Sequence, residues 1–460
     1  MPSWIRRALP ESCLVGALSL IWFSLMTPWG QFRDPDAFYH AHVSKLMLDH
    51  GPLTSFPWLD LTAFGQHFAD QHYFFHLILG PAIALIELFR LPYASLLGSQ
   101  LMAPVLATLA ALTLWSVLRA LRVDQAWMWV ALAMLVPSFS MRLLLAKASP
   151  LAIGLFLLII GAMAVGRPLV AMLAGALFVL SHGGWILSLL VAGSMLIANM
   201  LSRRFISDDG WEIAIRDASW RTFMALLAGI CLGIVLHPNR TELIRFLWVQ
   251  VVKIGLVRPT GTVLPGAEWL PANPLGVLTD LAPLAMAFLA IGLGLILAFR
   301  FPSSQFRLPA ETKAVRGHKW TFEDLRKMHE SVALALPLAI TLALSLKSQR
   351  FMEYLVPSFT VWIGSLGRFV DYRRLREIVL EAKHSLPPWG ERIALPLVIL
   401  LLAALAVHHA AGAWLNLRHG ALSFDAYRKT FREVTVRAKP GDRVFHSLVV
   451  FHDRSVVIDA

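Results

Sequence analysis

The short segment with the most chemistry in the sequence is DPDAFYH, residues 34–40, which directly follows the first long apolar run. Pro35 fixes its own φ and biases Asp34 toward an extended conformation, so the acidic pair is predicted to lie on a turn. Residues 37–50 have helical spacing, which makes Asp36 either the N-cap or the first-turn acid of a short helix. Capping alone leaves Asp34 unexplained.

Further acids and imidazoles follow this segment: Asp60, His67, Asp70, His72 and His76. Carboxylates beside histidines can bind a divalent ion, and the ion in turn neutralises a phosphate. Asp36 and His40 are therefore candidate metal ligands. No histidine pair has a zinc-binding spacing such as HExxH, so His182 and His237 are equally read as polar groups at helix ends.

Composition places these residues in a membrane protein. The 460 residues are 57% hydrophobic and only 15% charged, whereas a soluble chain has about 25% charged residues. Long uncharged runs predict an all-α polytopic fold, because in lipid only helices or closed barrels satisfy the backbone. The net charge of +12 does not imply nucleic-acid binding here, since basic residues mark the cytoplasmic side of such proteins. Cys13 and Cys231 both lie in apolar runs and indicate nothing about redox compartment.

Eleven apolar runs are candidate transmembrane helices: 12–29, 95–118, 126–139, 151–166, 168–181, 184–201, 220–236, 277–299, 332–347, 351–367 and 393–414. Another apolar stretch, 74–89, is shorter than the ~20 residues of a span and is interrupted by Gly80-Pro81. We predict that it is an interfacial helix. Residues 1–414 then form the transmembrane domain, with 30–94 as its first external loop.

Lysine and arginine placement sets the sidedness. With a cytoplasmic N-terminus, the cytoplasmic segments hold about twice as many Lys and Arg residues as the external loops, as the positive-inside rule requires. The acidic pair then faces outward together with Arg142, Lys147, Glu268 and Arg350. We expect a bacterial inner (plasma) membrane, with the active site on its extracytoplasmic face.

The tail, residues 415–460, changes pattern after the last span. Leu422–Phe431 is predicted to be a short helix, and the alternation between Arg443 and Ile458 predicts strands after a turn at 439–442. These elements are typical of the opening of an extracytoplasmic α/β domain, which the sequence does not complete.

Three segments resemble the catalytic subunits of oligosaccharyltransferases and their relatives, the integral-membrane glycosyltransferases of the GT-C class. DPDAFYH after the first span is one, and the run from Gln349 to Pro357, with its arginine, tyrosine and proline, is similar to the family's late-helix segment. The tail segment 439–445 is similar to the entry to the family's periplasmic domain.

The resemblance implies transfer of a sugar or oligosaccharide from a polyprenyl-phosphate or pyrophosphate lipid, with Mg²⁺ or Mn²⁺ as cofactor. Asp36 would bind metal and orient the acceptor with help from Asp34, and Arg350 would hold the donor phosphate. Arg142 and Lys147 offer further positive charge for that phosphate. Glu268 is the counterpart of a loop glutamate of the family. Partners are then the lipid-linked donor and membrane lipids.

The sequence also departs from the family pattern. The loop after the third run, residues 141–149, carries Arg142 and Lys147 and no acid, where the family has its second acidic motif. The family's Trp-Trp-Asp acceptor motif is absent, which favours a divergent transferase over protein N-glycosylation. The basic loop would suit a metal-independent mechanism. Two alternatives remain open: a non-catalytic pseudo-enzyme, and a transporter or flippase for lipid-linked sugars.

Overall fold

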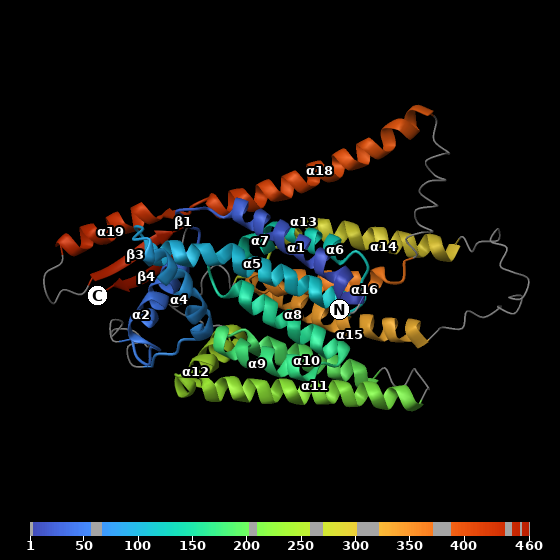
Figure 1. Ribbon diagram of the computed structural model, residues 1–460, viewed down its shortest axis with the longest axis horizontal. Helices are drawn as coiled ribbons and strands as arrows, with labels where there is room; N and C mark the ends of the chain where they lie inside the picture. The colour runs from blue at the N-terminus through green and yellow to red at the C-terminus, as the bar shows by residue number, and fades with distance from the viewer. Residues whose placement is uncertain are drawn as a thin grey trace, which may run out of the picture.

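The computed structural model describes residues 3–56, 67–201, 209–257, 270–300, 322–370, 388–437, 444–450 and 453–459. Within these ranges the long helices run side by side as a bundle (Figure 1). The helices up to residue 201 are α1 (Ser3–Met26), α2 (Asp36–His50), α4 (Tyr73–Leu88), α5 (Ala94–Ala120), α6 (Ala126–Met134), α7 (Pro137–Leu143), α8 (Ser149–Val165), α9 (Pro168–Ser181) and α10 (Trp185–Leu201). The later ones are α11 (Asp209–Leu236), α12 (Arg240–Leu247), the π-helix η3 (Trp248–Val257), α13 (Pro274–Asp280), α14 (Ala282–Arg300), α15 (Phe322–Lys347), the 3₁₀ turn η6 (Gln349–Phe351), α16 (Met352–Gly367), α18 (Pro388–Arg418) and α19 (Phe424–Arg437).

Each predicted apolar run is helical, but two runs are divided: 126–139 into α6 and α7, which meet at 87°, and 277–299 into α13 and α14, which meet at 73°. Among the described residues, three helical stretches are long and apolar enough to cross a membrane, or up to five spans if each bent helix pair counts as one. The three are Ala94–Ala120, Ala218–Leu236 and Arg326–Lys347. Several of the other apolar helices are shorter, so the number of eleven spans stays a prediction.

Close backbone approach holds α8 against α5. A Cβ atom at Gly161 would lie only 2.8 Å from Val117 Cγ2. Seven residues earlier on both helices, a Cβ atom at Gly154 would lie 4.0 Å from Ala110 Cα. Small residues at such positions let membrane helices pack tightly. Since seven residues along α8 match seven along α5, the two helices are parallel. The connection through α6 and α7 therefore returns the chain to the end of the bundle where α5 begins.

That end of the bundle gathers α2, α4, α12 and α19, at the left of Figure 1. Helix α4 covers the predicted interfacial stretch, and the Lys45 ammonium of α2 lies 2.9 Å from Glu87 Oε1 near the end of α4. An orientation of α4 in the membrane plane stays a prediction. At this end of the bundle lie the helix termini that the sequence predicted on the outer side of the membrane.

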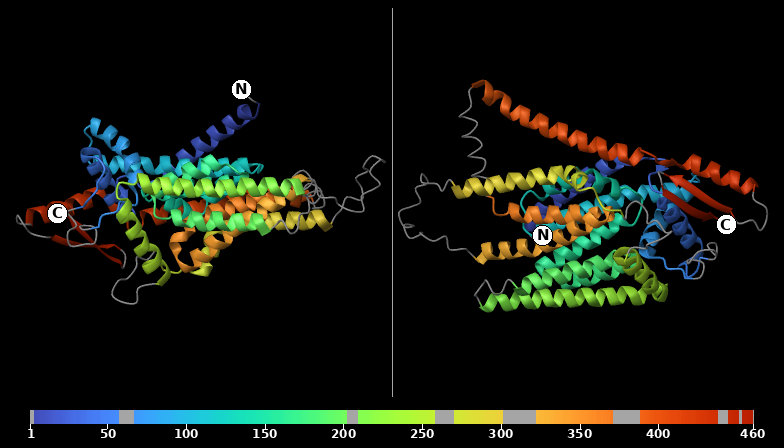
Figure 2. Two further views of the ribbon diagram at one scale, coloured as in Figure 1. Left: turned by 90° about the horizontal axis from the view of Figure 1, so that it is seen from below. Right: turned by 180° about the vertical axis from the view of Figure 1, so that it is seen from behind.

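The C-terminal segment returns to the first loop. Helix α18 runs along the outside of the bundle (Figure 2). After it, β2 (Leu422–Ser423) pairs antiparallel with β1 (Gln31–Phe32), and the ring of Tyr427 on α19 stacks on Phe38 of α2 with centroids 4.0 Å apart. The predicted short helix at 422–431 corresponds to α19.

Two strands follow α19. They are β3 (Val444–Val450) and β4 (Asp453–Asp459), and they form an antiparallel hairpin. The turn predicted at 439–442 lies outside the described residues. That this hairpin opens a larger domain stays a prediction.

Candidate functional site

An ion pair between the acidic turn and the basic loop forms the centre of the site. The Lys147 Nζ atom lies 2.7 Å from Asp34 Oδ2 and 2.7 Å from Asp36 Oδ2. One ammonium thus binds both carboxylates. The sequence predicted all three residues at one membrane face, with Lys147 assigned to the donor phosphate. In the structure Lys147 instead contacts the acids.

The acidic turn has the local structure that Pro35 dictates. Pro35 is the N-cap of α2 with φ −62°, and Asp36 is the first residue of the helix. The Asp36 N–H donates to Asp34 Oδ1 at 2.9 Å. Asp34 therefore provides the capping contact, while Asp36 is the first-turn acid. This leaves the Asp36 side chain, which is 62% exposed against 22% for Asp34, as the carboxylate that a second molecule can reach.

A strained backbone position presents Lys147. The preceding residue, Ala146, is buried and has φ +54°, in the left-handed region that non-glycine residues rarely adopt. An L-residue in this conformation costs about 1–2 kcal/mol. The bent pair α6–α7 delivers this segment, and α8 begins two residues after Lys147 at Ser149. The loop conformation is thus maintained against a local energetic cost.

Charge makes the two acids unequal. Burial raises the pKa of the Asp34 carboxyl, and the Lys147 ammonium opposes this only in part. Burial also acts to raise the pKa of Asp36, but Lys147 outweighs it and the pKa is lowered, with smaller contributions from His72 and Arg350. Asp36 is therefore the more strongly ionised carboxylate of the pair.

Arg350 lies close enough to Asp36 to contribute to the lowered pKa of that carboxyl. It is at the end of the bundle where α15 ends. It belongs to η6, between α15 and α16. Arg142 holds this segment, because its Nη1 atom lies 3.6 Å from Glu353 Oε2 and its Nη2 atom donates to the Gln349 carbonyl at 3.3 Å. The residues predicted to bind the donor phosphate thus take part in two separate sets of contacts. Lys147 binds the acidic pair, and Arg142 fastens the turn that carries Arg350.

Beside this pair lies a buried chain of hydrogen bonds between Asp70, His76 and His40. Asp70 Oδ2 lies 2.8 Å from His76 Nδ1, and His76 Nε2 lies 2.8 Å from His40 Nδ1. The pKa of Asp70 is lowered, because His76 and its hydrogen bond outweigh the raising effect of burial. An ionised Asp70 can only accept, so His76 donates from Nδ1 to Asp70 Oδ2.

Three more histidines connect this chain to other elements. His72 Nδ1 lies 3.0 Å from the Ser181 carbonyl at the end of α9. His237 accepts the Asn239 N–H at Nδ1, which fixes its tautomer, and so donates from Nε2 to the Asp70 carbonyl at 2.9 Å. His182 accepts the Gly184 N–H at Nδ1. These contacts agree with the reading of His182 and His237 as polar groups at helix ends.

The sequence pointed to these residue types but did not predict their pairing. The available signal was the spacing of His72 and His76, four residues apart on one helix face, with Asp70 just ahead. Asp70 and His76 are 2% and 0% exposed, so their contacts depend on tertiary packing.

Two of the predicted site residues need separate comment. His40 was predicted as a metal ligand, but its Nδ1 atom is taken up by His76. The described residues contain no group of three or more His, Cys, Asp or Glu side chains arranged to hold a metal ion. Glu268 lies outside the described residues.

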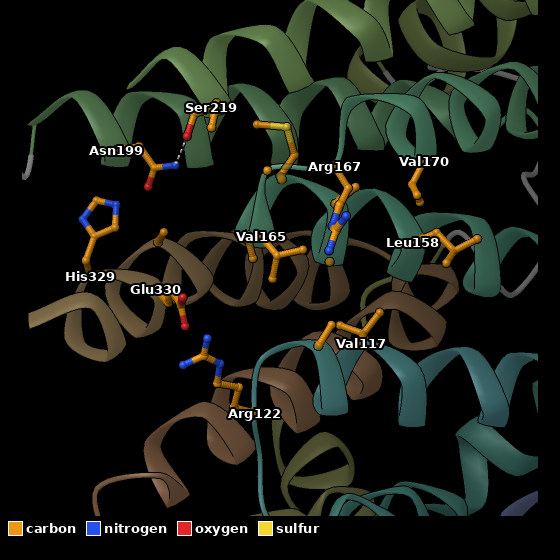
Figure 3. Close-up of a pocket in the computed structure, with 18 of the residues that line it drawn as sticks. Val117, Arg122, Leu158, Val165, Arg167, Val170, Asn199, Ser219, His329 and Glu330 are labelled. Carbon is orange, nitrogen blue, oxygen red and sulfur yellow. Dashed lines mark hydrogen bonds between the residues drawn. The ribbon is translucent and has the colours of Figure 1, made fainter. Parts of the chain in front are cut away.

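A cavity of about 560 Å³ lies at the other end of α8 (Figure 3). The C-terminal half of α8 and the first turns of α15 line it. Helix α8 has 17 residues, which corresponds to roughly 25 Å at 1.5 Å per residue. The cavity is therefore separate from the acidic pair, which lies just before the start of that helix.

Comparison with known proteins identifies the architecture. No protein-family model matches the chain, and no curated protein matches it. Among solved structures, the chain is similar to the archaeal oligosaccharyltransferase AglB from Archaeoglobus fulgidus, in complex with an inhibitory peptide and a dolichol-phosphate. The TM-score is 0.50 at 13% identity, over 90% of this chain and 56% of that one.

Two further structures of the oligosaccharyltransferase from Archaeoglobus fulgidus agree. The apo form gives a TM-score of 0.55 at 12% identity, over 94% of this chain and 60% of that one. The form tethered to an acceptor peptide with the NVT sequon gives 0.52 at 14%, over 90% and 56%. The chain has the oligosaccharyltransferase fold.

This finding confirms the distant resemblance that DPDAFYH and the Arg350 segment indicated. Together with the apolar helices it makes the chain an integral membrane protein with an all-helical transmembrane architecture. The chain spans 56–60% of the length of the solved proteins. At 12–14% identity the similarity shows the fold, and the activity is a matter for proposal.

Proposed function

We propose that this protein transfers a sugar or oligosaccharide from a polyprenyl-phosphate or pyrophosphate lipid to an acceptor at the extracytoplasmic face of the membrane. The observation that carries the proposal is the meeting of Asp36, Asp34, Lys147 and Arg350 at one end of an oligosaccharyltransferase-like bundle. An acceptor needs a carboxylate, and a departing phosphate needs positive charge. This cluster supplies both.

The proposed reaction is a single displacement at the anomeric carbon. The acceptor group is held by Asp36, its proton passes to that carboxylate, and its heteroatom forms the new bond to the anomeric carbon. The bond from that carbon to the phosphate oxygen breaks, and the polyprenyl phosphate or pyrophosphate leaves with the electron pair. Arg350 neutralises the negative charge that develops on the leaving group.

The site's lipid setting supports this substrate class. The acidic turn lies at the end of the apolar bundle, where a lipid-linked donor can keep its chain in the membrane and its phosphate at the boundary. The excess of Lys and Arg in the loops of the other end favours a cytoplasmic N-terminus and an outward-facing site. A bacterial inner membrane is part of the same proposal.

The test is transfer in proteoliposomes that contain the purified protein and a set of radiolabelled polyprenyl-phosphate sugars. We expect transfer by the wild type and a loss of about 100-fold or more for Asp36→Asn. The matched control is Asp49→Asn, which changes another carboxylate of α2 that pairs with Lys45. Full activity of Asp36→Asn would refute the assignment. Donor binding without transfer would favour a pseudo-enzyme, and donor movement across the bilayer would favour a flippase.

A further inference from the structure

We infer that the Lys147 ammonium occupies the position that a divalent metal would take between Asp34 and Asp36, so that sugar transfer by this protein does not require a metal ion. This inference rests on the proposed function. It concerns the cation that serves the acidic pair.

The first argument is the geometry of the pair. Both Oδ2 atoms lie 2.7 Å from Lys147 Nζ, the distance of a charge-assisted hydrogen bond. An ammonium has three N–H donors, and two of them are directed at these oxygens. A Mg²⁺ ion would bind the same oxygens at about 2.0–2.1 Å. It cannot do so without displacing the ammonium, because both cations need the same space.

The second argument is the set of available ligands. Mg²⁺ takes oxygen ligands in an octahedral arrangement and usually binds through one or two carboxylates, with waters and substrate phosphates as its other ligands. In the part of the chain that the structure describes, no cluster of three potential ligands surrounds this position. The nearby Asp70 carboxylate is 2% exposed and is bonded to His76. The basic loop 141–149 contributes no acid. Asp34 and Asp36 are therefore the carboxylates that this position offers, and Lys147 binds both.

The third argument is that the ammonium is built into the loop. The Lys147 side chain is only 15% exposed, although lysine usually extends into solvent. It follows Ala146, whose backbone lies in the left-handed region. Electrostatically, the ammonium balances one of the two negative charges, and Arg350 stands close enough to Asp36 to lower its pKa further. A second positive charge from a metal is not needed for balance.

The chemical consequence is a fixed positive charge that keeps its proton throughout the reaction. Lys147 orients both carboxylates, so that Asp36 presents its exposed edge to the acceptor. Asp36 takes up the acceptor proton, and the leaving phosphate is met by Arg350. No electron transfer or exogenous cation enters the balance of this step.

The experiment compares wild type, Lys147→Ala and Lys45→Ala in the same proteoliposomes, each with EDTA, Mg²⁺ or Mn²⁺. Lys45 is the control because it also pairs with carboxylates of α2 and α4, away from the site. We expect the wild type and Lys45→Ala to keep their rates within about twofold in EDTA. Lys147→Ala should lose about 100-fold in EDTA. Mg²⁺ or Mn²⁺ should restore part of its activity, because the ammonium no longer blocks the acids.

A second readout does not depend on turnover. Mn²⁺ binding, followed by electron paramagnetic resonance, should be absent at this site in the wild type and present in Lys147→Ala. It should be lost again in Lys147→Ala combined with Asp36→Asn. Wild-type transfer that EDTA abolishes and Mn²⁺ restores would overturn the inference, as would Mn²⁺ binding by the wild type that depends on Asp36. If no donor is transferred at all, the proposed function fails, while the resonance experiment still decides the question of the cation.

A separate observation, the cavity at the other end of α8, points to a second ligand. From it we infer a binding site for the phosphate headgroup of an anionic phospholipid. Figure 3 shows Arg122 and Arg167 directed into this space from two sides, with Glu330 and His329 on α15 beside them. Arg326 also lines it. Three arginines and one glutamate thus line the cavity.

Glu330 pairs with Arg368, which is not one of the lining residues and whose side chain is 2% exposed, and it also lies 3.8 Å from Arg326. Among the described residues that line the cavity, three arginines stand against one glutamate, so the formal charge of this lining is positive and suits a phosphate. Its walls include the apolar side chains Val117, Leu158 and Val165, which suit an acyl chain. Basic pockets between helices on the cytoplasmic side of a membrane are typical sites for anionic lipid headgroups.

The test is native mass spectrometry of the intact protein released from bilayers of phosphatidylglycerol mixed with phosphatidylcholine. We expect the wild type to retain phosphatidylglycerol at least about fivefold over phosphatidylcholine. The double variant Arg122→Ala/Arg167→Ala should lose this preference, whereas Arg245→Ala, an exposed arginine of α12 on the opposite side, should keep it. Equal retention of both lipids, or displacement by glycerol phosphate alone, would overturn the inference.

Discussion

At the residue scale, the two acids of the DPD turn have different tasks. Asp34 accepts the N–H of Asp36, the first residue of α2, through its Oδ1 atom. The Asp36 carboxylate caps no backbone N–H of the described residues and is 62% exposed. Lys147 joins them, so neither carboxylate acts in isolation. A carboxylate that begins a helix and one that meets a substrate respond differently to the same substitution.

We therefore predict losses of different size for Asp34→Asn and Asp36→Asn. Asp34→Asn should keep the capping contact, since an amide oxygen also accepts, and should lower transfer less than Asp36→Asn does. Asp34→Ala should in addition destabilise the protein by about 1 kcal/mol through loss of the cap. Thermal unfolding in detergent, measured beside transfer rates, checks this. Equal losses of transfer in Asp34→Asn and Asp36→Asn would contradict it.

The buried histidines predict how stability depends on pH. Burial lowers the pKa of His72 from 6.5 to about 4, and it lowers the pKa values of His40 and His182 well below the ordinary value. The unfolded chain binds protons on these residues near pH 6.5 while the folded chain does not. Unfolding is therefore favoured as the pH falls.

We expect the melting temperature to be constant above about pH 7 and to fall steadily between about pH 6.5 and pH 4. The variant His72→Gln should flatten this fall, because it removes one of the titrating groups. Melting curves in one detergent at a series of pH values measure the effect. A melting temperature that rises on acidification would contradict it.

At the element scale, the site depends on the bend between α6 and α7 and the loop that follows. The run 126–139, predicted as one span, is divided into α6 and α7, because Pro137 starts α7 after an 87° turn; the pair can still count as one broken span. Proline cannot continue a helix without losing a hydrogen bond, and it is favoured at a first helical position, so the chain turns there. The shortened elements bring the loop back to the acids, with Ala146 in the left-handed conformation.

Ala146 gives a prediction at this scale. Ala146→Gly should stabilise the protein by up to about 1 kcal/mol, because glycine adopts φ +54° without steric cost. Ala146→Val should destabilise it and lower transfer, because a β-branched residue tolerates this conformation poorly and displaces Lys147. Unfolding midpoints and transfer rates measure both effects. Equal stability of the two variants would show that the conformation carries no strain.

At the scale of the whole molecule, the sequence predicted the class but not the long-range contacts that close the site, and the sidedness stays a prediction. The apolar runs located the helices. The order of these runs, together with the bias of Lys and Arg, placed Asp36, Lys147 and Arg350 at one end, because both signals can be counted directly in the sequence. The pairing of β1 with β2, and of Asp70 with His76, involves residues whose types are compatible with many partners. Their contacts follow from packing, which no local pattern encodes.

The C-terminal segment should accordingly influence the site. Tyr427→Ala, which removes the ring stacked on Phe38, should lower transfer and increase amide hydrogen exchange in residues 31–40. Tyr427→Phe keeps the stacked ring and should behave as the wild type. Exchange followed by mass spectrometry reads the effect in the loop itself. Unchanged exchange in Tyr427→Ala would show that α19 does not order the acidic turn.

The β1–β2 pairing also sets an order of events during biosynthesis. Gln31 pairs with Ser423, and the Phe424 N–H donates to the Gly30 carbonyl, so nearly the entire chain separates the two strands. A ribosome that is still inserting the middle helices has not yet made the partner of the segment that leads into Asp34. The acidic turn therefore reaches its final packing only after α18 has been synthesised. The proposed transfer site is therefore completed only after the helices around it have been synthesised.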